Sequence, residues 1–425
     1  MVYKYDRNRG MGRKFDIPIF YRSPLITTIK SYRKSQDSRK QDLQPSVLNL
    51  GKVTFKVARH FGFCFGVENA IEIAYKAVKE NPGKRVFLLS EMIHNPHVNS
   101  DLMRRGVRFL QTTEGEQLID FNELKPEDIV IVPAFGTTVS LYQKLEGLGL
   151  DLVKYNATCP FVEKVWKRAR QLGEKGYTII IHGKNQHEET RATFSHAVLS
   201  APAVVIRDIE EAKLLAKYIQ RDLPLDNFLN DFKGRVSPEF DPNIHLDRIG
   251  VVNQTTMLAT ETQVLSDLLR ASINNYFVDA QEQERFADTR DTLCYATSEN
   301  QDAVHSLVKS GGDLALVVGG YNSSNTSHLV EICEEHVPTY YIKDADEIID
   351  SETIRHLLWR EPKVVESKNW LPKNKEKLVV LITAGASCPD ALVEDVIKRV
   401  SGFFEVDYIL ENTYENFLEK VPQNL

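Results

Sequence analysis

Apolar and polar positions along the chain follow a pattern that occurs three times. In each repeat a strand-like apolar run leads through a short turn to a cysteine, and helical spacing follows. After Cys64, apolar residues recur at Val67, Ile71, Ala74 and Val78, a period typical of an amphipathic helix. Two later cysteines have the same context, although the run before the last of them is the weakest strand. The pattern predicts three consecutive α/β units of similar structure.

Polar clusters recur at a nearly constant distance from these cysteines. Each cluster ends a second apolar run, whose length is that of a buried strand. The clusters begin 30, 28 and 29 residues after their cysteines, in the pairs Cys64 and His94, Cys159 and His187, Cys294 and Ser323. A third strand-like run then ends each unit in small or hydroxyl residues, at Gly136, Thr255 and Ser387.

Strands that alternate with helices favour parallel sheets, whose ligands bind at the carboxyl ends of the strands. The cysteines and polar clusters all follow strands. We therefore expect an α/β protein of three similar domains with parallel-type sheets, arranged with pseudo-threefold symmetry around one centre. The expected division is a basic N-terminal extension (1–50), a first unit with Cys64 (51–158), a second with Cys159 (159–290) and a third with Cys294 (291–425). Stretches 221–247 and 361–377, rich in Pro, Asp or Lys, are predicted surface insertions.

The composition favours a soluble protein with sizeable cores. Of the 425 residues 42% are hydrophobic, yet no stretch approaches the roughly 18 apolar residues of a membrane helix. The first residues lack the apolar core of a secretory signal, so we expect a cytoplasmic protein. Residues 1–42 carry 11 Lys and Arg against 4 Asp, a balance of +7 in a chain of net charge −6. They suit a nucleic-acid arm, a transit peptide or a surface extension packed along the body, and we favour the last.

The cysteines point to a metal cluster. They number five, are widely separated and include no CxxC pair, which disfavours a disulfide framework and structural zinc. An iron-sulfur cluster or isolated core thiols remain. Matching contexts favour a cluster held by Cys64, Cys159 and Cys294, with one iron open to a substrate oxygen. Cys333 lies at helical spacing and is expected in the core, while the different context of Cys388 disfavours a fourth ligand.

Two polar segments suggest a bound anion and a proton donor. Asn322 to His328, NSSNTSH, offers hydroxyls, an amide and an expected helix N-terminus, which suits phosphate oxygens but also simple helix caps. In the HEET segment Glu189 lies beside histidine and threonine, and removal of a hydroxyl as water needs such a proton donor. An exposed glutamate at a helix start would have the same sequence.

The chain resembles the family of 4-hydroxy-3-methylbut-2-enyl diphosphate reductases over about residues 53–412, through GFCFGVENAI, EMIHNPHVN, NATCPFVEKV, HEET, NQTT, CYAT, NSSN and TAGAS. The resemblance implies an iron-sulfur enzyme that ends the non-mevalonate isoprenoid pathway. Its reaction reduces the allylic alcohol diphosphate to isopentenyl and dimethylallyl diphosphates with loss of water. A ferredoxin or flavodoxin-type electron donor is implied, without nucleic-acid or membrane partners, and a plastid stroma location if the source is a plant or alga. Plant and cyanobacterial-type members have similar N-terminal extensions.

The resemblance also implies a role for each matching residue. The three cysteines would ligate a 4Fe-4S cluster whose fourth iron takes the substrate hydroxyl and is easily lost, leaving 3Fe-4S. Glu189 would supply the proton, Thr255 would contact the hydroxyl end, and Thr297 matches a position near the cluster. The diphosphate or the polar wall would involve His94, His187, Ser323, Ser324, Asn325 and Ser387.

One segment departs from the family pattern. Many bacterial members have a histidine where this chain has Phe135, and extended members are similar to this chain in lacking it. Because phenylalanine cannot donate to a phosphate, we expect the Gly136 backbone and Thr137 or Thr138 to replace that contact.

The main alternative is a different open-site cluster enzyme on a similar scaffold, such as quinolinate synthase, which the NSSN and HEET segments disfavour. Radical S-adenosylmethionine chemistry is disfavoured, because the closely spaced three-cysteine motif that it requires is missing from the sequence. A cluster-based redox or RNA-binding sensor is the non-enzymatic alternative.

Overall fold

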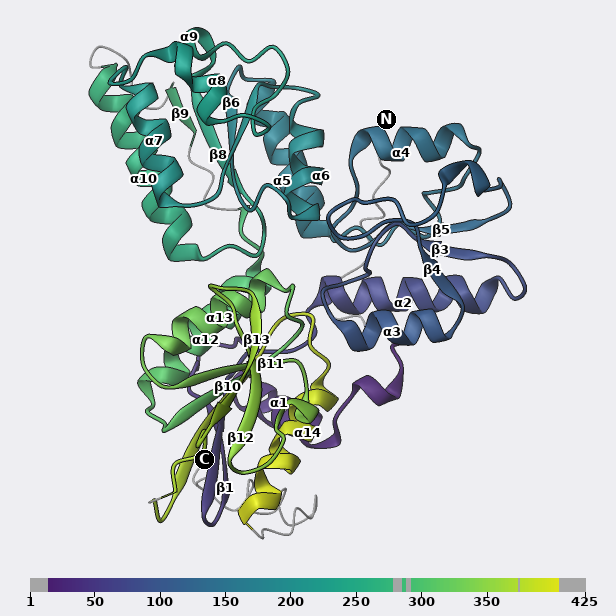
Figure 1. Ribbon diagram of the computed structural model, residues 1–425, viewed down its shortest axis with the longest axis vertical. Helices are drawn as coiled ribbons and strands as arrows, with labels where there is room; N and C mark the ends of the chain where they lie inside the picture. Colours follow the sequence, from purple (N-terminus) through teal and green to yellow (C-terminus); the bar gives the residue numbers. More distant parts are fainter. Residues whose placement is uncertain (1–13, 278–284, 288–291, 374, 405–425) are drawn as a thin grey trace.

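The computed structural model describes residues 14–277, 285–287, 292–373 and 375–404. Three α/β lobes are visible, each built on its own mostly parallel sheet (Figure 1). The predicted fold class is confirmed. No helix within the described ranges is both long and apolar enough to cross a membrane.

The first unit has a parallel sheet in the order β4-β3-β5. Helix α2 packs on it because its apolar face, including Ile71 and Ala74, meets Ile131 in one core. The elements are α2 (Phe65–Glu80), β3 (Val86–Leu88), α3 (Pro96–Arg104), β4 (Val107–Phe109), η2 (Phe121–Glu123), β5 (Ile129–Ile131) and α4 (Val139–Gly147).

The second unit has a parallel sheet in the order β7-β6-β8-β9. Strands β6 and β8 are buried along their whole length, as expected for strands covered on both faces. The elements are α5 (Pro160–Gly173), β6 (Thr178–His182), α6 (Glu188–Ala197), β7 (Ala203–Ile206), α7 (Ile209–Ile219), η3 (Leu225–Asn227), α8 (Phe228–Asp231), α9 (Pro242–His245), β8 (Ile249–Asn253), α10 (Ala259–Tyr276) and β9 (Phe286–Ala287).

The third unit has the order β1-β2-β14-β10-β11, parallel except for the edge strand β1. A separate hairpin, β12-β13, lies beside β11. The elements are η1 (Ile19–Tyr21), α1 (Pro24–Gln36), β1 (Ser46–Leu50), β2 (Val53–Val57), α12 (Tyr295–Lys309), β10 (Leu314–Val318), α13 (Ser324–Glu334), β11 (Thr339–Ile342), η5 (Ala345–Glu347), β12 (Thr353–Leu358), β13 (Lys363–Lys368), β14 (Leu378–Ala384), α14 (Asp390–Ser401) and η6 (Gly402–Phe404).

The three sheets share one strand order. In each, the first strand after the cysteine lies between the second and the third, as β6 lies between β7 and β8. A further parallel pairing then comes from the segment that precedes the next cysteine. Strand β9 pairs with β8, β2 pairs with β14, and Asn156 forms a parallel bridge with Val132 beside β5. Each cysteine therefore follows a segment paired to one sheet and begins the helix of the next unit.

The pairing of β2 with the third sheet corrects one predicted domain boundary. Residues 51–158 were expected to form the first unit, but β2 belongs to the third sheet, where Val53, Phe55 and Val57 are buried in the core. Pairing with β14 buries these side chains, whereas the first sheet ends at the Asn156 bridge. The remaining boundaries stay predictions.

The two presumed surface insertions contribute to the cores. Within 221–247, Phe228 and Phe232 are fully buried and Phe240 nearly so, in the core of the second unit. Within 361–377, β13 pairs with β12, and Trp370 is 2% exposed. Most other residues of both stretches are exposed or half-buried, so the surface prediction fails for these aromatic residues and not for the stretches as a whole.

The described part of the N-terminal extension packs along the body, as expected. Helix α1 contacts α14, and Ile26 and Ile29 are buried in the third core. Lys30 forms an ion pair with Asp390 at 2.7 Å, and the Ser23 hydroxyl donates to Glu394. Residues 1–13 lie outside the described ranges.

Candidate functional site

A cavity lies where the three units meet. Every unit contributes one cysteine and at least one polar cluster to its wall. The predicted site residues that line it are Cys64, Cys159, Cys294, His94, His187, Glu189, Thr255, Thr297, Ser323, Ser324, Asn325 and Ser387.

The three cysteines have the same local geometry. Cys64, Cys159 and Cys294 are the N-cap residues of α2, α5 and α12, each with an extended backbone. Burial raises the pKa of every one of these thiols, that of Cys294 to about 12. The pKa of Cys159 lies well above its ordinary value, first through burial and then through repulsion from the other two thiolates. Three thiolates are thus stable together only with a cationic group between them.

Gly66 permits the close approach of two of these cysteines. A Cβ atom added to this glycine would lie 2.5 Å from the Cys159 Sγ and 4.0 Å from the Cys64 Sγ. A side chain at position 66 would therefore displace the Cys159 thiol. Within the part of the chain that the structure describes, no three His, Cys, Asp or Glu side chains are grouped to hold a metal ion directly.

Glu189 is a buried acid in the cavity wall. It is 1% exposed and accepts hydrogen bonds from the Thr255 backbone N–H at 2.5 Å and the Thr255 hydroxyl at 3.0 Å. Burial raises its pKa to about 7, against the lowering effect of these two bonds. A carboxyl of this pKa can hold and release a proton near neutral pH.

Two histidines face each other beside this acid. The His187 Nδ1 accepts from the Glu189 N–H at 3.2 Å, so its proton lies on Nε2. That nitrogen is 3.2 Å from the Nε2 of His94, which must accept. His94 is then protonated at Nδ1, a buried atom that lies 3.6 Å from the Glu91 carboxylate. Phe135 stacks on His94 with ring centroids 4.3 Å apart and covers this pair.

The third unit supplies hydroxyl and amide groups. Ser323 caps α13, and the Asn325 Oδ1 accepts from the Ala386 N–H at 2.9 Å. The Ser387 hydroxyl donates to the His94 carbonyl at 3.1 Å, which joins the third unit to the first. The Ser324 Oγ and the Asn325 Nδ2 are buried without a partner. Buried donors of this kind indicate a ligand that accepts hydrogen bonds.

The model of the LytB protein family matches residues 55–401. The chain belongs to the LytB family. Two similar relatives are named 4-hydroxy-3-methylbut-2-enyl diphosphate reductase. The protein of Picosynechococcus sp. is 41% identical over 83% of this chain and 85% of its own. The protein of Microcystis aeruginosa is 40% identical over 94% of both chains, a match that includes residues beyond the family model.

A solved structure shares the fold of this LytB-family chain. It is described as the E-1-hydroxy-2-methyl-but-2-enyl-4-diphosphate reductase from Plasmodium falciparum, with 20% identity and a TM-score of 0.57. The match covers 81% of this chain and 86% of that one, and it speaks for the fold alone. The family predicted from the cysteine and polar segments is confirmed, and the alternative cluster enzyme and the sensor are not favoured.

One predicted part of the site, the segment after Phe135, lies elsewhere in this LytB-family chain. Gly136, Thr137 and Thr138 line an adjoining pocket rather than the cavity. A Cβ added to Gly136 would lie 2.4 Å from the Trp166 ring, and the Thr138 hydroxyl caps α4. Phe135 forms the cavity wall where these residues were expected.

The two remaining cysteines lie away from the cavity. Cys333 and Cys388 are fully buried in the core of the third unit, and neither lines the cavity. The expectation for Cys333 is confirmed. Ser387 faces the cavity, but the thiol of the next residue, Cys388, instead lies 3.6 Å from the carbonyl of Pro389.

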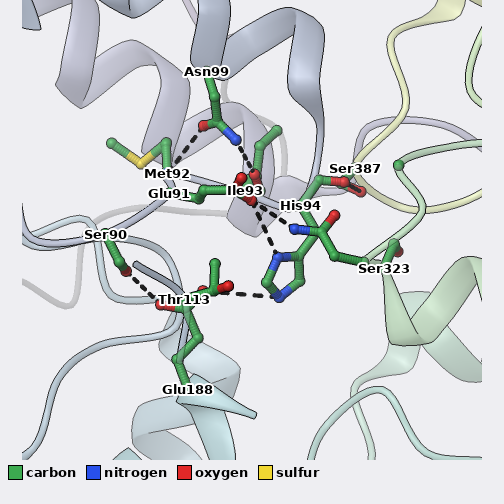
Figure 2. Close-up of polar contacts among 12 residues, drawn as sticks. Ser90, Glu91, Met92, Ile93, His94, Asn99, Thr113, Glu188, Ser323 and Ser387 are labelled. Atoms are coloured by element: carbon green, nitrogen blue, oxygen red, sulfur yellow. Dashed lines mark hydrogen bonds and ion pairs between the residues drawn. The ribbon is translucent and has the colours of Figure 1, made fainter. Parts of the chain in front are cut away.

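A second buried acid was missed. Glu188 accepts from the Ser90 hydroxyl and lies 3.9 Å from the His94 Nε2, opposite Glu91 (Figure 2). Burial raises its pKa to about 7. The HEET segment contains it, but the sequence does not tell which of two adjacent glutamates faces the cavity.

Glu188 should make stability depend on pH. Its pKa rises from 4.5 in the unfolded chain to about 7 in the fold, so its contribution is complete below about pH 4.5 and is lost as the pH rises through about 7. At about 1.4 kcal/mol per unit the loss is about 3 kcal/mol. In urea denaturation, Glu188→Gln should reduce the fall in stability between about pH 5 and pH 8 by a comparable amount.

Glu91→Gln is the matched control, because this carboxylate also lies near His94 but is 30% exposed. If Glu188→Gln and the wild type show the same pH dependence, the buried-acid assignment is wrong.

Proposed function

We propose that the protein is a 4-hydroxy-3-methylbut-2-enyl diphosphate reductase. The observation that carries the proposal is the single cavity in which three cysteines from three units face unpartnered buried donors. In the reaction the allylic C–O bond breaks, and two electrons and two protons convert the substrate to isopentenyl or dimethylallyl diphosphate plus water. Membership of the LytB family and the names of its relatives support this activity.

The residues fit an iron-sulfur cluster held by Cys64, Cys159 and Cys294. Their thiolates need a cationic centre, and Gly66 leaves space for the convergence. A cube-shaped cluster normally takes four thiolates, so three leave one iron without a protein ligand. When bound, the cluster would supply electrons and a Lewis-acidic iron at the substrate hydroxyl.

The polar wall would bind the diphosphate. The Ser324 Oγ and the Asn325 Nδ2 are buried donors that phosphate oxygens would satisfy. His187 stays neutral, since burial lowers its pKa well below the usual value. Neutral donors fix the orientation of an anion without placing a permanent charge next to Glu189.

Glu189 would deliver a proton to the leaving hydroxyl oxygen. Its hydrogen bonds from Thr255 fix the carboxyl at the cavity wall, and its raised pKa keeps part of the population protonated near neutral pH. Thr255 is therefore a positioning residue. Thr297, which lines the cavity near Cys294, would complete the wall.

The ligand assignment predicts which cysteines are needed for iron. Each of the variants Cys64→Ala, Cys159→Ala and Cys294→Ala should lose most of its bound iron, because the cavity has only these three thiolates to hold a cluster. Anaerobic reconstitution followed by iron and sulfide analysis measures the loss. Cys333→Ala is the control, a buried thiol outside the cavity. Equal iron loss in the control, or none in the three variants, would reject the assignment.

The proton-donor role predicts a large kinetic effect of Glu189→Gln. Turnover should fall by about 10²–10⁴-fold, the usual contribution of a positioned acid. Iron and sulfide content should stay at the wild-type level, since the carboxyl is not a ligand in this assignment. Near-normal turnover would exclude Glu189 as the acid, and lost iron would point to a structural role.

The diphosphate assignment predicts an effect on substrate affinity. Ser324→Ala removes a donor to a charged group and should raise the substrate KM by about tenfold. Thr137→Val is the control, because Thr137 lines the adjoining pocket and should leave KM unchanged. Equal KM values in Ser324→Ala and the wild type would contradict the assignment, and a raised KM in the control would restore the earlier expectation for Thr137.

A further inference from the structure

A second depression lies on the outer side of Cys64. Lysines of the N-terminal extension and residues of the body line it, and it is open to the surface. We call it the basic groove and define it by Lys30, Lys34, Lys40, Arg59, His60 and Glu299. Cys64 and Ala296 line both the basic groove and the cavity. The wall between the surface and the cysteine centre is therefore thin at this place.

The charge of the basic groove is opposite to that of the whole chain. Its lining has four Lys and Arg against one Glu, in a protein of net charge −6. Lys34 is exposed and forms no ion pair within the part of the chain that the structure describes, while Lys30 pairs with Asp390 at 2.7 Å and Lys40 pairs with Glu299 at 3.0 Å. A positive patch of this kind favours an acidic partner.

Two buried side chains in the basic groove each have one nitrogen without a hydrogen-bond partner, although Arg59 also donates to the Asp37 carbonyl at 3.4 Å and His60 lies 3.9 Å from Glu299. Arg59 is 7% exposed and His60 is 9% exposed, and the Arg59 Nε and the His60 Nε2 have no hydrogen-bond partner. Buried polar atoms are normally satisfied. A carboxylate from a bound protein would accept a charge-assisted bond from Arg59 and a neutral one from His60, whose pKa burial lowers to about 4.

Aromatic side chains give the basic groove an apolar floor. Phe61 is buried, whereas Phe63, Phe65 and Tyr295 are half-buried. An apolar centre inside a charged rim is the usual anatomy of a protein interface. Electron-transfer partners use small interfaces of this type, which form and separate at each turnover.

We propose that the basic groove is the docking site of an acidic one-electron carrier protein. This inference rests on the proposed function, which requires two electrons per product and thus the oxidation of two reduced carriers by one electron each. The two electrons and two protons break one C–O bond and release one water. Docking at the basic groove places the carrier against the wall that contains Cys64, at a surface that none of the expected substrate donors lines.

The test measures binding and turnover separately, with a plant-type 2Fe-2S ferredoxin as probe. Lys34→Glu/Lys40→Glu reverses one unpaired and one ion-paired lysine beside the basic groove. Lys213→Glu/Lys217→Glu is the matched control on α7, at the other end of the molecule (Figure 1), where Lys213 pairs with Glu210 at 2.7 Å. Calorimetry of the reconstituted enzyme gives the Kd, and assays compare reduced ferredoxin with reduced methyl viologen.

The groove variant should raise the Kd and the KM for ferredoxin by at least about fivefold and weaken their salt dependence. The control and the rate with methyl viologen should change by less than about twofold. If the double variant does not fold, as judged by circular dichroism, Lys34→Glu alone is measured against Lys217→Glu with the same expected direction.

Three outcomes would overturn the proposal. Unchanged ferredoxin binding in an enzyme active with methyl viologen would reject the docking site alone. Tighter binding of a single-stranded RNA than of ferredoxin, lost in the groove variant, would assign the basic groove to nucleic acid. A wild-type protein inactive with both donors would overturn the proposed function and the docking proposal with it.

Discussion

Each of the three cysteines stands where the chain leaves one sheet and begins the first helix of the next unit. This connection holds the units together, because the segment before the cysteine pairs with one sheet and the helix after it packs on another. It also brings three buried thiols to one place, with Gly66 leaving room for the Cys159 sulfur. Burial and mutual repulsion oppose ionisation of these thiols, so all three can be thiolates only when a cationic group lies between them.

The rest of the cavity is arranged around that requirement with few fixed charges. Burial holds His187 neutral, and the hydrogen bond between the two histidines fixes the proton positions on both rings. Glu188 and Glu189 both have a pKa raised to about 7, so protons are available on either side of the histidine pair. Phe135 covers the His94 ring and excludes solvent at the position where a polar group was expected. The wall is thus suited to an anion that is held by neutral donors.

Cys64 lies between two different environments. On its inner side are the neutral donors and the buried acid Glu189, and on its outer side are the cations that the N-terminal extension adds. Helix α1 is fixed in place by its apolar contacts in the third core and by the Lys30 to Asp390 ion pair. The extension therefore forms part of a defined surface next to the cysteine centre.

The sequence by itself determined the repeated α/β pattern, the three ligand cysteines as candidates and most residues of the polar wall. These features are local: the periodicity marks strands and helices, and polar residues after strands mark the carboxyl edge of a parallel sheet. Only the tertiary structure decided which sheet receives β2, because strand pairing between distant segments leaves no signal in either strand. It also decided that Thr137 and Thr138 face another pocket and that Phe228 is core, since both depend on neighbours far apart in the chain. The choice between Glu188 and Glu189 is of the same kind, because adjacent residues at a helix start point in different directions and only the packing around them fixes their partners.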